Sequence, residues 1–593
     1  MIALDTEASY AKGRDIGSLG VHNYVSHSDT DHFMVSIYDQ DTGLSFVGDP
    51  KDAPWDQIRG KEICCHNYSY DSQVLREYER RGIIKEPLNE KGFCTANMAA
   101  YLQAPRHLLG ASEQLLKISV DKSVRDKFKG KDYRTLPNDT KVEIAQYAMM
   151  DAKACWLLWK NYESQWPANE RKYAEHTTMM GNRGVCLDTD MMSKAKQTFE
   201  EELWKLEKQI PWAGSAPILS LVQLKDACRA AGIPAPETTA RKDDTFMEWV
   251  EQYSGKAPFV EVVGRYRSIN RTLEVLKSMQ TRMIDGRLRY GLKYYGAVPT
   301  GRWAGDSGLN MQNLPRDPCL GYRLRELLVP APGKVFISAD MSQIEPRISL
   351  WATDDERQLS MIREGMCVYE AHARQTLGYD LKESLKSMAK KDSKYEQMRA
   401  FCKARVLGLT YGQFAKGFQA YAKTFGIELT LEQAEQQVSQ FREKNPLLVK
   451  FWKDLEQTMK FKRGDTYTVT LPSGRKMNYF DVRVDRKPNS RFFQIHARTV
   501  MGEHNTYYSS GKLHNNVCQG TARDVLADAV LRIEYELGLP VVLTVHDEVL
   551  VEVDAADAED ARIAIERVMA TPPEWLPNIP LASDCFIADR YSK

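Results

Sequence analysis

Residues 335–340 read VFISAD, and residues 541–553 read VVLTVHDEVLVEV. The first is an apolar run that ends in a carboxylate, and the second places two carboxylates between apolar halves. These patterns predict a strand that ends at Asp340 and a hairpin with Asp547 and Glu548 at its tip. Acids from two strands can bring two Mg²⁺ ions to the separation that in-line phosphoryl chemistry requires. We therefore interpret these distant segments as halves of one metal site.

A second pattern, R-x3-K-x7-YG, lies between these two segments and begins at Arg399. Four of its side chains follow at intervals of four residues: Arg399, Lys403, Leu407 and Tyr411. Because four residues advance about 40° around an α-helix, the spacing predicts one slowly turning stripe. On this stripe the two cations suit the phosphates of a nucleotide, the leucine its sugar and the tyrosine its base. A core helix with snorkelling ends explains the stripe alone, but not its position between two acidic strands.

Size and composition leave the function open. At 593 residues the chain is too long for one hydrophobic core, so two to four domains are expected. The net charge of +1 requires that any DNA-binding field come from local clusters of basic residues. The 11 cysteines contain no C-x-x-C pair and favour a reducing cytoplasm. The opening MIALDTEASY has no signal-peptide pattern and no window is long and apolar enough for a bilayer, so we expect no membrane partner.

The apolar pattern divides the chain into segments of different character. Residues 1–165 alternate strand-like and helical patterns, residues 170–295 are mostly helical, and residues 351–490 are dominated by helices. A β-hairpin is predicted around residues 472–474, within GDTYTVTLPSGRKMNYF. The basic stretch of residues 265–293 is most simply a solvated helix face. Its place just before the acidic and basic motifs favours contact with a phosphate backbone instead.

The N-terminal segment carries a second set of acids. Side chains on one face of a strand repeat every two residues, and one turn of helix spans about four. At these spacings IALDTE, HNYSYD and YAMMD present Asp5 and Glu7, Asn67 and Asp71, and Tyr147 and Asp151. Each pair alone is more often structural, but four carboxylates and a tyrosine can hold two metal ions and orient a water for phosphodiester hydrolysis. Together and in this order, the motifs resemble the DEDD-type 3′→5′ exonucleases in their tyrosine variant.

Nearly the whole chain resembles the family A DNA polymerases of the phage-like kind, with its motifs in the expected order. The resemblance rests on R-x3-K-x7-YG and on DMSQIEPR, VHDEV, TGRWAGDSGLNMQNLPR (300–316) and GKLHNNVCQGTARD (511–524). It implies a multidomain α/β protein with a ribonuclease H-like exonuclease domain followed by a right-hand polymerase. The expected activity is DNA-templated addition of deoxynucleotides to a primer 3′ end, with 3′→5′ proofreading, in replication of a phage genome in the host cytoplasm.

The resemblance also implies roles for single residues. Asp340 and Asp547 would bind two Mg²⁺ ions, for which Mn²⁺ could substitute, with Glu548 as a nearby acid. Asp5, Glu7, Asp71 and Asp151 would bind the metal ions of the exonuclease, beside Tyr147. Nucleotide contacts would come from Arg399, Lys403, Leu407, Tyr411, Gln343, Tyr369 and Glu345, the last by crowding the 2′ position and rejecting ribonucleotides. Arg302, Asn515 and Gln519 would face the minor groove, where hydrogen-bond donors can test pair geometry, and His546 would lie beside the primer terminus.

Three positions depart from the family pattern. Leu407 stands where an aromatic residue is usual, which affects sugar discrimination in the family. Tyr369 stands where the family often has a phosphate-contacting histidine, and His372 is close enough in sequence to replace it. Gly511 replaces a minor-groove arginine, although Lys512 is adjacent.

The resemblance divides the chain into an exonuclease domain (1–165), connecting helices and thumb (166–295), first palm segment (296–350), fingers (351–490) and second palm segment (491–593). The expected partners are primer–template DNA, deoxynucleoside triphosphates and a single-stranded 3′ end at the exonuclease site. We expect a monomer, alone or with replisome partners that the sequence does not identify.

Three other functions fit parts of the sequence. An exonuclease with a nucleic-acid-binding C-terminal part would not need Asp340, Asp547, Lys403 and Tyr411. A single-subunit RNA polymerase shares the acidic strands, but Glu345 and the editing motifs favour DNA. A non-enzymatic DNA scaffold would not need two sets of metal-binding acids.

Overall fold

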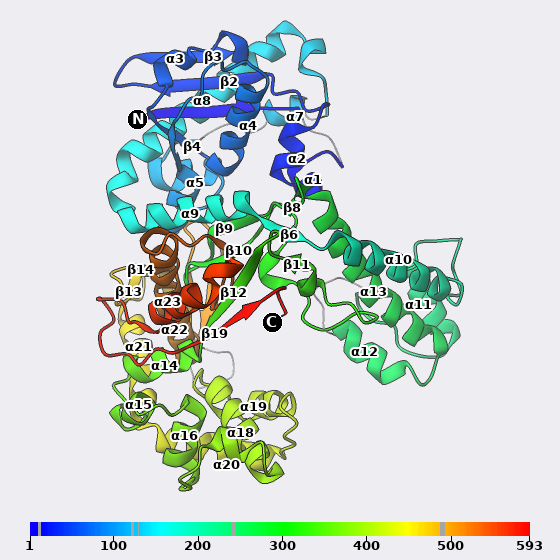
Figure 1. The fold of residues 1–593 in the computed structure, drawn as a ribbon, viewed down its shortest axis with the longest axis vertical. Coiled ribbons are helices and arrows are strands. Elements are labelled where there is room, and N and C mark those ends of the chain that lie inside the picture. Colours follow the sequence, from blue (N-terminus) through cyan, green and yellow to red (C-terminus); the bar gives the residue numbers. More distant parts are fainter. Residues whose placement is uncertain (10–12, 120–123, 129, 239–244, 487–492, 593) are drawn as a thin grey trace.

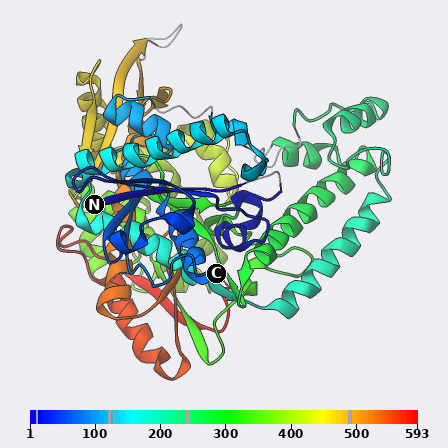
Figure 2. The ribbon, with the colours of Figure 1, turned by 90° about the horizontal axis from the view of Figure 1, so that it is seen from above.

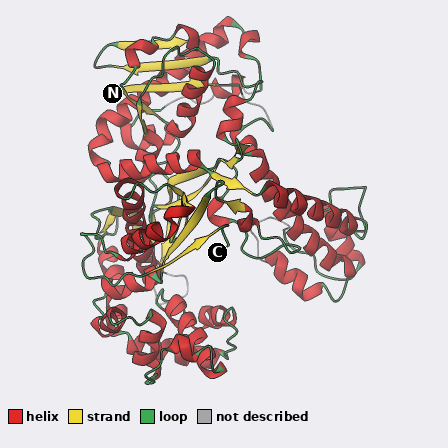
Figure 3. Cartoon of the chain, in the orientation of Figure 1, coloured by secondary structure: helices red, strands yellow, loops and turns green. Residues whose placement is uncertain are grey.

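The computed structural model describes residues 1–9, 13–119, 124–128, 130–238, 245–486 and 493–592. An N-terminal body lies above a central sheet, a helical arm projects to one side, and a lower helical body lies beneath (Figure 1). Seen from above, the arm again extends away from the rest (Figure 2). Strands gather in the N-terminal body and the centre, whereas the arm and the lower body are helical (Figure 3). No helix within the described ranges has both the length and the apolar character needed to cross a membrane.

The N-terminal body (residues 1–165) is built on a five-stranded sheet in the order β3-β2-β1-β4-β5. Its strands are β1 (Ile2–Glu7), β2 (Met34–Asp39), β3 (Leu44–Gly48), β4 (Glu62–Cys65) and β5 (Lys91–Cys94). β1 runs parallel to β4 and antiparallel to β2. Helix α8 (Asn138–Tyr162) packs on β1 and β2, so the acidic motifs of β1 and α8 lie close together.

The central sheet confirms both predictions made from the apolar runs. Its order is β17-β18-β12-β19, with β12 (Lys334–Met341), β17 (Val541–Val545), β18 (Glu548–Asp554) and β19 (Ser583–Ala588). β17 and β18 form the predicted hairpin, and β12 pairs antiparallel with β18. Helices α22 (Ser510–Leu531) and α23 (Ala558–Ala570) contribute to the same hydrophobic core as these strands. Every residue of β17 is buried, which explains its uninterrupted apolar run.

The helical arm (residues 189–281) contains α10 (Thr189–Glu207), α11 (Leu221–Ala230), α12 (Thr245–Tyr253) and α13 (Pro258–Thr281). α10 packs along α13, and Trp212, Phe246 and Val260 contribute to a separate core toward the tip. The helical pattern predicted up to residue 295 is wrong beyond Thr281. The chain there forms short strands and then β9, which pairs with β10: β7 (Met283–Ile284), β8 (Arg287–Leu288), β9 (Gly291–Ala297) and β10 (Arg302–Asp306).

The basic stretch of residues 265–293 is therefore not one helix face. Arg282 is buried, and its Nη2 donates to the carbonyl oxygens of Gly17 at 2.5 Å and Ser307 at 2.6 Å. Arg287 forms an ion pair of 3.1 Å with the buried carboxylate of Glu552. These guanidiniums satisfy protein groups, so the prediction of a phosphate-binding face is wrong for this half of the stretch.

The lower helical body (residues 356–461) follows α14 (Ile344–Ala352), which leaves the central sheet. Its main helices are α15 (Glu356–Arg363), α16 (Val368–Leu377), α18 (Ser393–Ala404), α19 (Ala415–Lys423), α20 (Leu431–Lys444) and α21 (Pro446–Phe461). A side sheet follows, comprising β13 (Tyr467–Thr470), β14 (Lys476–Arg486), β15 (Phe493–Arg498) and β16 (Thr506–Tyr508). β13 and β14 are the predicted hairpin, and β14 also pairs with β15. The domain boundary predicted at residue 490 lies outside the described residues.

Candidate functional site

The predicted acids of the central sheet meet at one end of that sheet. The register of β12 and β18 places Asp340 opposite Glu548, and Asp547 lies in the turn that precedes β18. The backbone N–H of Met341 donates to the carbonyl of Asp547 at 3.0 Å. Burial and the nearby charge of Asp340 raise the pKa of Asp547 to about 6. Two carboxylates held side by side in a half-buried site repel each other, and their oxygens are the donors that Mg²⁺ prefers.

Glu548 is buried, and two hydroxyl groups bind its carboxylate. The hydroxyl of Ser338 donates to its Oε1, and the hydroxyl of Tyr591 donates to its Oε2 at 2.9 Å. Arg325 Nη1 in turn donates to the Tyr591 hydroxyl at 3.1 Å. The C-terminal tail thus orients Glu548 beside the two aspartates. Sequence reasoning missed Tyr591 and Arg325 because neither belongs to a recognisable motif.

The turn that carries His546 and Asp547 is held by Gln312. His546 adopts a left-handed backbone conformation (φ 57°), which such a tight turn requires. Gln312 Oε1 accepts from the backbone N–H of His546 at 3.0 Å, and its Nε2 donates to the carbonyl of Thr544. Sequence reasoning did not single out this buried glutamine, although it lies in the quoted segment 300–316. His546 itself is exposed.

Arg302, Glu345 and Tyr411 form one hydrogen-bonded group. Arg302 Nη2 pairs with Glu345 Oε1, and the hydroxyl of Tyr411 donates to Glu345 Oε2 at 3.0 Å. Burial and the Glu345 charge raise the pKa of Tyr411 well above its usual range, so the phenol is the hydrogen-bond donor. The sequence assigned Arg302 to the minor groove, Glu345 to the sugar and Tyr411 to the base. In the structure the three side chains lie together. They lie near Asp547, because the Glu345 charge also raises the pKa of that aspartate.

The two cations of R-x3-K-x7-YG converge on Tyr369. The charged ends of Arg399 and Lys403 each lie 6.0 Å from the centre of its ring. Burial, and secondarily Arg399, lowers the pKa of Lys403. Leu407 packs against the same apolar cluster as Tyr369. Gln343 is nearby in the chain, and its Oε1 accepts from the backbone N–H of Val368 at the start of α16, at 2.8 Å.

The prediction of one α-helical stripe is wrong beyond Ala404. α18 ends there, and a π-helical segment, Arg405–Leu409, leads into a turn at Gly412. A π-helix has more residues per turn than an α-helix, so the four-residue spacing no longer keeps one face. Leu407 therefore stays with the lower body, whereas Tyr411 packs against the core of the central sheet.

His372 does not take the place of the missing histidine. It is 1% exposed, and its Nε2 accepts from Arg405 Nε at 3.3 Å inside the lower body. Burial, and secondarily the Arg405 charge, lowers the pKa of His372 to about 3, so the ring is neutral at physiological pH. The residue beside Arg399 and Lys403 is instead Tyr369, which is itself buried.

Asn515 and Gln519 lie one turn apart on α22, and both are half-buried. Gly511 lies at the start of this helix, and close packing explains why an arginine does not stand there. A Cβ atom at Gly511 would lie 2.1 Å from the carbonyl oxygen of Tyr411, a backbone atom that cannot swing aside. Lys512 points elsewhere and donates to the carbonyl of Tyr507 at 3.1 Å.

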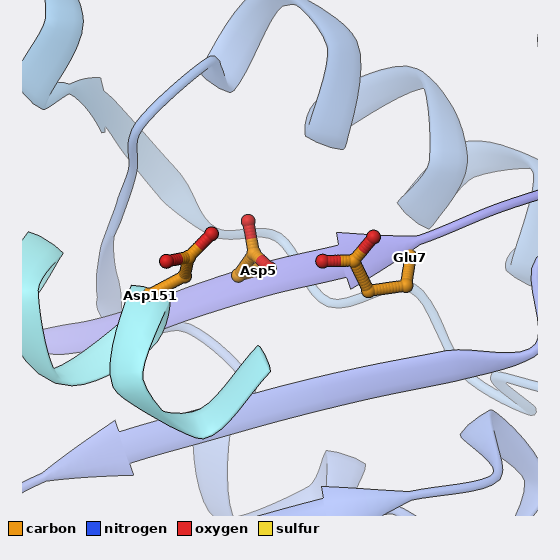
Figure 4. A group of neighbouring side chains, drawn as sticks. All are labelled: Asp5, Glu7 and Asp151. Carbon is orange, nitrogen blue, oxygen red and sulfur yellow. The ribbon is translucent and has the colours of Figure 1, made fainter. Parts of the chain in front are cut away.

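A second site lies in the N-terminal body. Asp5 and Glu7 on β1 and Asp151 on α8 each offer a carboxylate oxygen within 4.8 Å of the others, and their side chains point toward one another (Figure 4). Three oxygen donors at this spacing fit a hard divalent cation. The period-two spacing on the strand was the signal that found the first two residues.

Asp71 and Tyr147 line the same cavity of 620 Å³ as these three acids. Burial raises the pKa of Asp71 to about 7, although the Thr6 hydroxyl donates to its Oδ1 at 2.7 Å. Burial and the charges of Glu7 and Asp151 raise the pKa of Tyr147, which keeps its phenol protonated. The cavity can thus admit the end of a nucleic-acid strand beside a cluster of acids.

Residues 189–593 match the sequence model of DNA polymerase family A. The chain is 26% identical to the DNA polymerase of Bacillus phage SP02, over 66% of this chain and 71% of that protein. It is 24% identical to DNA polymerase I of Caldicellulosiruptor bescii, over 71% of this chain and 46% of the relative. With the thermostable DNA polymerase I of Thermus filiformis the identity is 27%, over 70% and 46%. The chain thus spans about half the length of these bacterial relatives.

The fold is similar to that of the solved POL domain of Pol1 from M. smegmatis, in complex with DNA primer-template and dNTP. The TM-score is 0.68 at 17% identity, and the comparison covers 100% of this chain and 95% of that one.

Proposed function

Since this chain belongs to DNA polymerase family A, we propose that it extends a primer 3′ end on a DNA template and edits that end at a second, 3′→5′ exonuclease site. The central sheet would be the palm, the helical arm the thumb and the lower helical body the fingers. The N-terminal body would be the exonuclease domain. The Pol1 domain was solved with a primer–template and a dNTP, and we assign the same partners to this chain.

Polymerases of this family are metal-dependent, and the donor set here fits that dependence. Asp340 and Asp547 would hold two Mg²⁺ ions, or Mn²⁺ in their place. Bound there, such ions activate the attacking hydroxyl and neutralise the leaving pyrophosphate. Asp547 is held in position for binding a metal ion because Gln312 fixes the turn that carries it.

The side chains around these aspartates position the nucleotide. Arg399 and Lys403 would bind the triphosphate, with the ring of Tyr369 near both. Arg302 and Tyr411 keep the Glu345 carboxylate in place, where it would crowd a 2′-hydroxyl. Asn515 and Gln519 on α22 would contact the minor groove of the newly formed pair, with His546 near the primer terminus.

The editing site is supported by the convergence of Asp5, Glu7 and Asp151. With Asp71 they would hold two divalent ions, which supply an activated water for phosphodiester hydrolysis. Tyr147, protonated at neutral pH, would orient that water. A second site is needed because selection in one pocket discriminates only modestly between similar substrates.

The neighbouring positions of Asp340 and Asp547, joined through Met341, carry the proposal most directly. The test is a 5′-labelled primer–template incubated with Mg²⁺, with and without deoxynucleotides, and resolved on a gel. We expect extension when all four are present and shortening when they are withheld. Shortening alone would leave only the exonuclease. The absence of both extension and shortening would favour the DNA scaffold.

A further inference from the structure

Gln103 joins the N-terminal body to the side sheet, and no motif marks it. It follows α5 (Thr95–Tyr101), is fully buried and has a left-handed backbone conformation (φ 57°). This conformation is uncommon for a residue other than glycine and is retained where surrounding contacts require it. The contacts that require it come from the other side of the domain boundary.

The side-chain amide of Gln103 acts as an extra peptide group near the start of β14. Its Oε1 accepts from the backbone N–H of Asn478 at 2.6 Å. Its Nε2 donates to the carbonyl of Asn478 at 2.8 Å and to that of Thr499 at 2.7 Å. The Gln103 carbonyl also accepts from the N–H of Met501 at 2.9 Å. Four hydrogen bonds therefore cross the boundary at one buried residue, where leaving polar groups unmatched is costly.

Both ends of this junction lead to a proposed active site. A few residues after Gln103, His107, Leu108 and Leu109 form part of the wall of the exonuclease cavity. On the other side, Tyr479 follows Asn478, and its hydroxyl accepts from Asn516 Nδ2 at 3.0 Å. Asn516 lies on α22 beside the residues that face the minor groove.

The apolar packing around the junction is continuous between the two parts. One core cluster contains Ala104 and Leu108 of the N-terminal body, Tyr294 and Tyr295 of β9, and Ala527 of α22. An interface that resembles a domain core resists the relative motion expected of ordinary domain contacts.

We infer that Gln103 is a positioning residue that fixes the mouth of the exonuclease cavity relative to the palm, so that a frayed primer end reaches it without leaving the enzyme. The inference rests on the editing function proposed above. Transfer within one complex depends on the effective concentration of the strand end at the second site. A loosened junction spreads the positions of that site and lowers this concentration, while leaving both sites chemically intact.

The test uses the full chain and a primer–template with a mismatched 3′ end. Enzyme and DNA are mixed without metal, and the reaction is started with Mg²⁺ and excess unlabelled DNA, so that only the first binding event is scored. Gln103→Glu keeps the size of the side chain but removes both N–H donors. Gln103→Asn keeps the amide and suits the left-handed backbone, but is one methylene shorter. We expect both to lower the fraction of ends edited before dissociation by roughly threefold or more.

Thr499→Ala is the matched control, because it changes the same junction but keeps the carbonyl that Gln103 contacts. Extension of a paired primer and hydrolysis of a single strand are measured for every variant and should stay within about twofold of the parent. Unchanged single-event editing in both Gln103 variants would overturn the inference. An equal loss of single-strand hydrolysis would also overturn it, because Gln103 would then shape the cavity itself. A parent enzyme that hydrolyses no single strand would instead overturn the editing function on which the inference rests.

Discussion

Glu345 depends on two neighbours that lie far from it in the chain. Arg302 and Tyr411 each bind one of its carboxylate oxygens, so the side chain is held from both sides. A flexible glutamate would sweep a large volume, whereas a fixed one blocks a defined volume beside the sugar. We therefore propose that the rejection of ribonucleotides depends on the three residues together.

Replacing Glu345 with alanine should relax the rejection of ribonucleotides. Removing a side chain that crowds the 2′ position weakens discrimination by about tenfold or more. Single-turnover incorporation of matched ribo- and deoxynucleotides measures the ratio, and Glu356→Ala, a surface acid on α15, is the control. Unchanged selectivity would remove Glu345 as the gate.

Gly511 is required by close packing against the turn at Tyr411. We expect Gly511→Ala to lower the free energy of unfolding by about 1–3 kcal/mol and to slow extension, because the added Cβ meets a backbone oxygen. Gly417→Ala on α19 is the matched control, since a Cβ there meets nothing within 4 Å. Urea unfolding and primer extension report the two effects, and equal behaviour of the two variants would refute the steric account.

At the scale of elements, α9 (Ala168–Arg183) is joined to the central sheet through one carboxylate, that of Glu534. His176 Nε2 lies 3.2 Å from Glu534, and Arg183 pairs with the same carboxylate at 2.6 Å. The backbone N–H of Val541, at the start of β17, donates to Glu534 at 2.8 Å. Despite partial burial, these hydrogen bonds and charges lower the pKa of Glu534 to about 2. One carboxylate thus anchors both a helix and a strand of the central sheet.

This anchor should make stability depend on pH. Because the folded-state pKa of Glu534 lies below its unfolded value of about 4.3, its contribution is present above that value and is lost as pH falls toward 2. We expect Glu534→Gln to lose about 1–2 kcal/mol at pH 7, with allowance for solvent screening, and to show a smaller loss at pH 3. Glu536→Gln, an exposed neighbour, is the control. Parallel stability curves for Glu534→Gln and the parent would contradict the role.

At the scale of the whole molecule, the two acid clusters lie in different parts of the fold. One cluster lies at the end of the central sheet, and the other lies between β1 and α8 of the N-terminal body. No carboxylate is shared between them in the part of the chain that the structure describes. Their chemistry should therefore be separable by single substitutions.

Asp547→Ala should abolish extension, by at least about a hundredfold, and leave excision of a single strand intact. Asp5→Ala should do the reverse, so that each variant serves as the control for the other. Both are measured on the labelled primer in separate reactions. If each change removed both activities, the two-site organisation would be wrong.

Local patterns were sufficient where an element carries its own signal. The strand β12 and the hairpin β17–β18 follow from apolar runs that end or turn at acids, and the juxtaposition of Asp5 and Glu7 follows from the two-residue period of a strand. The stripe from Arg399 to Tyr411 was predicted only in part, because spacing assumes a regular α-helix and does not reveal a π-helical segment.

The sequence by itself determined where the acids and cations lie along the chain and which strands carry the acids of the central sheet, because spacing and apolar runs are local properties. Only the tertiary structure decided which distant side chains hold them: Gln312 on the Asp547 turn, Tyr591 on Glu548, and Gln103 across the domain boundary. It also buried His372 inside the lower body, where its ring accepts a hydrogen bond from Arg405. Contacts between residues separated by tens to hundreds of positions leave no periodic trace in a single sequence, so the fold alone brings such partners together.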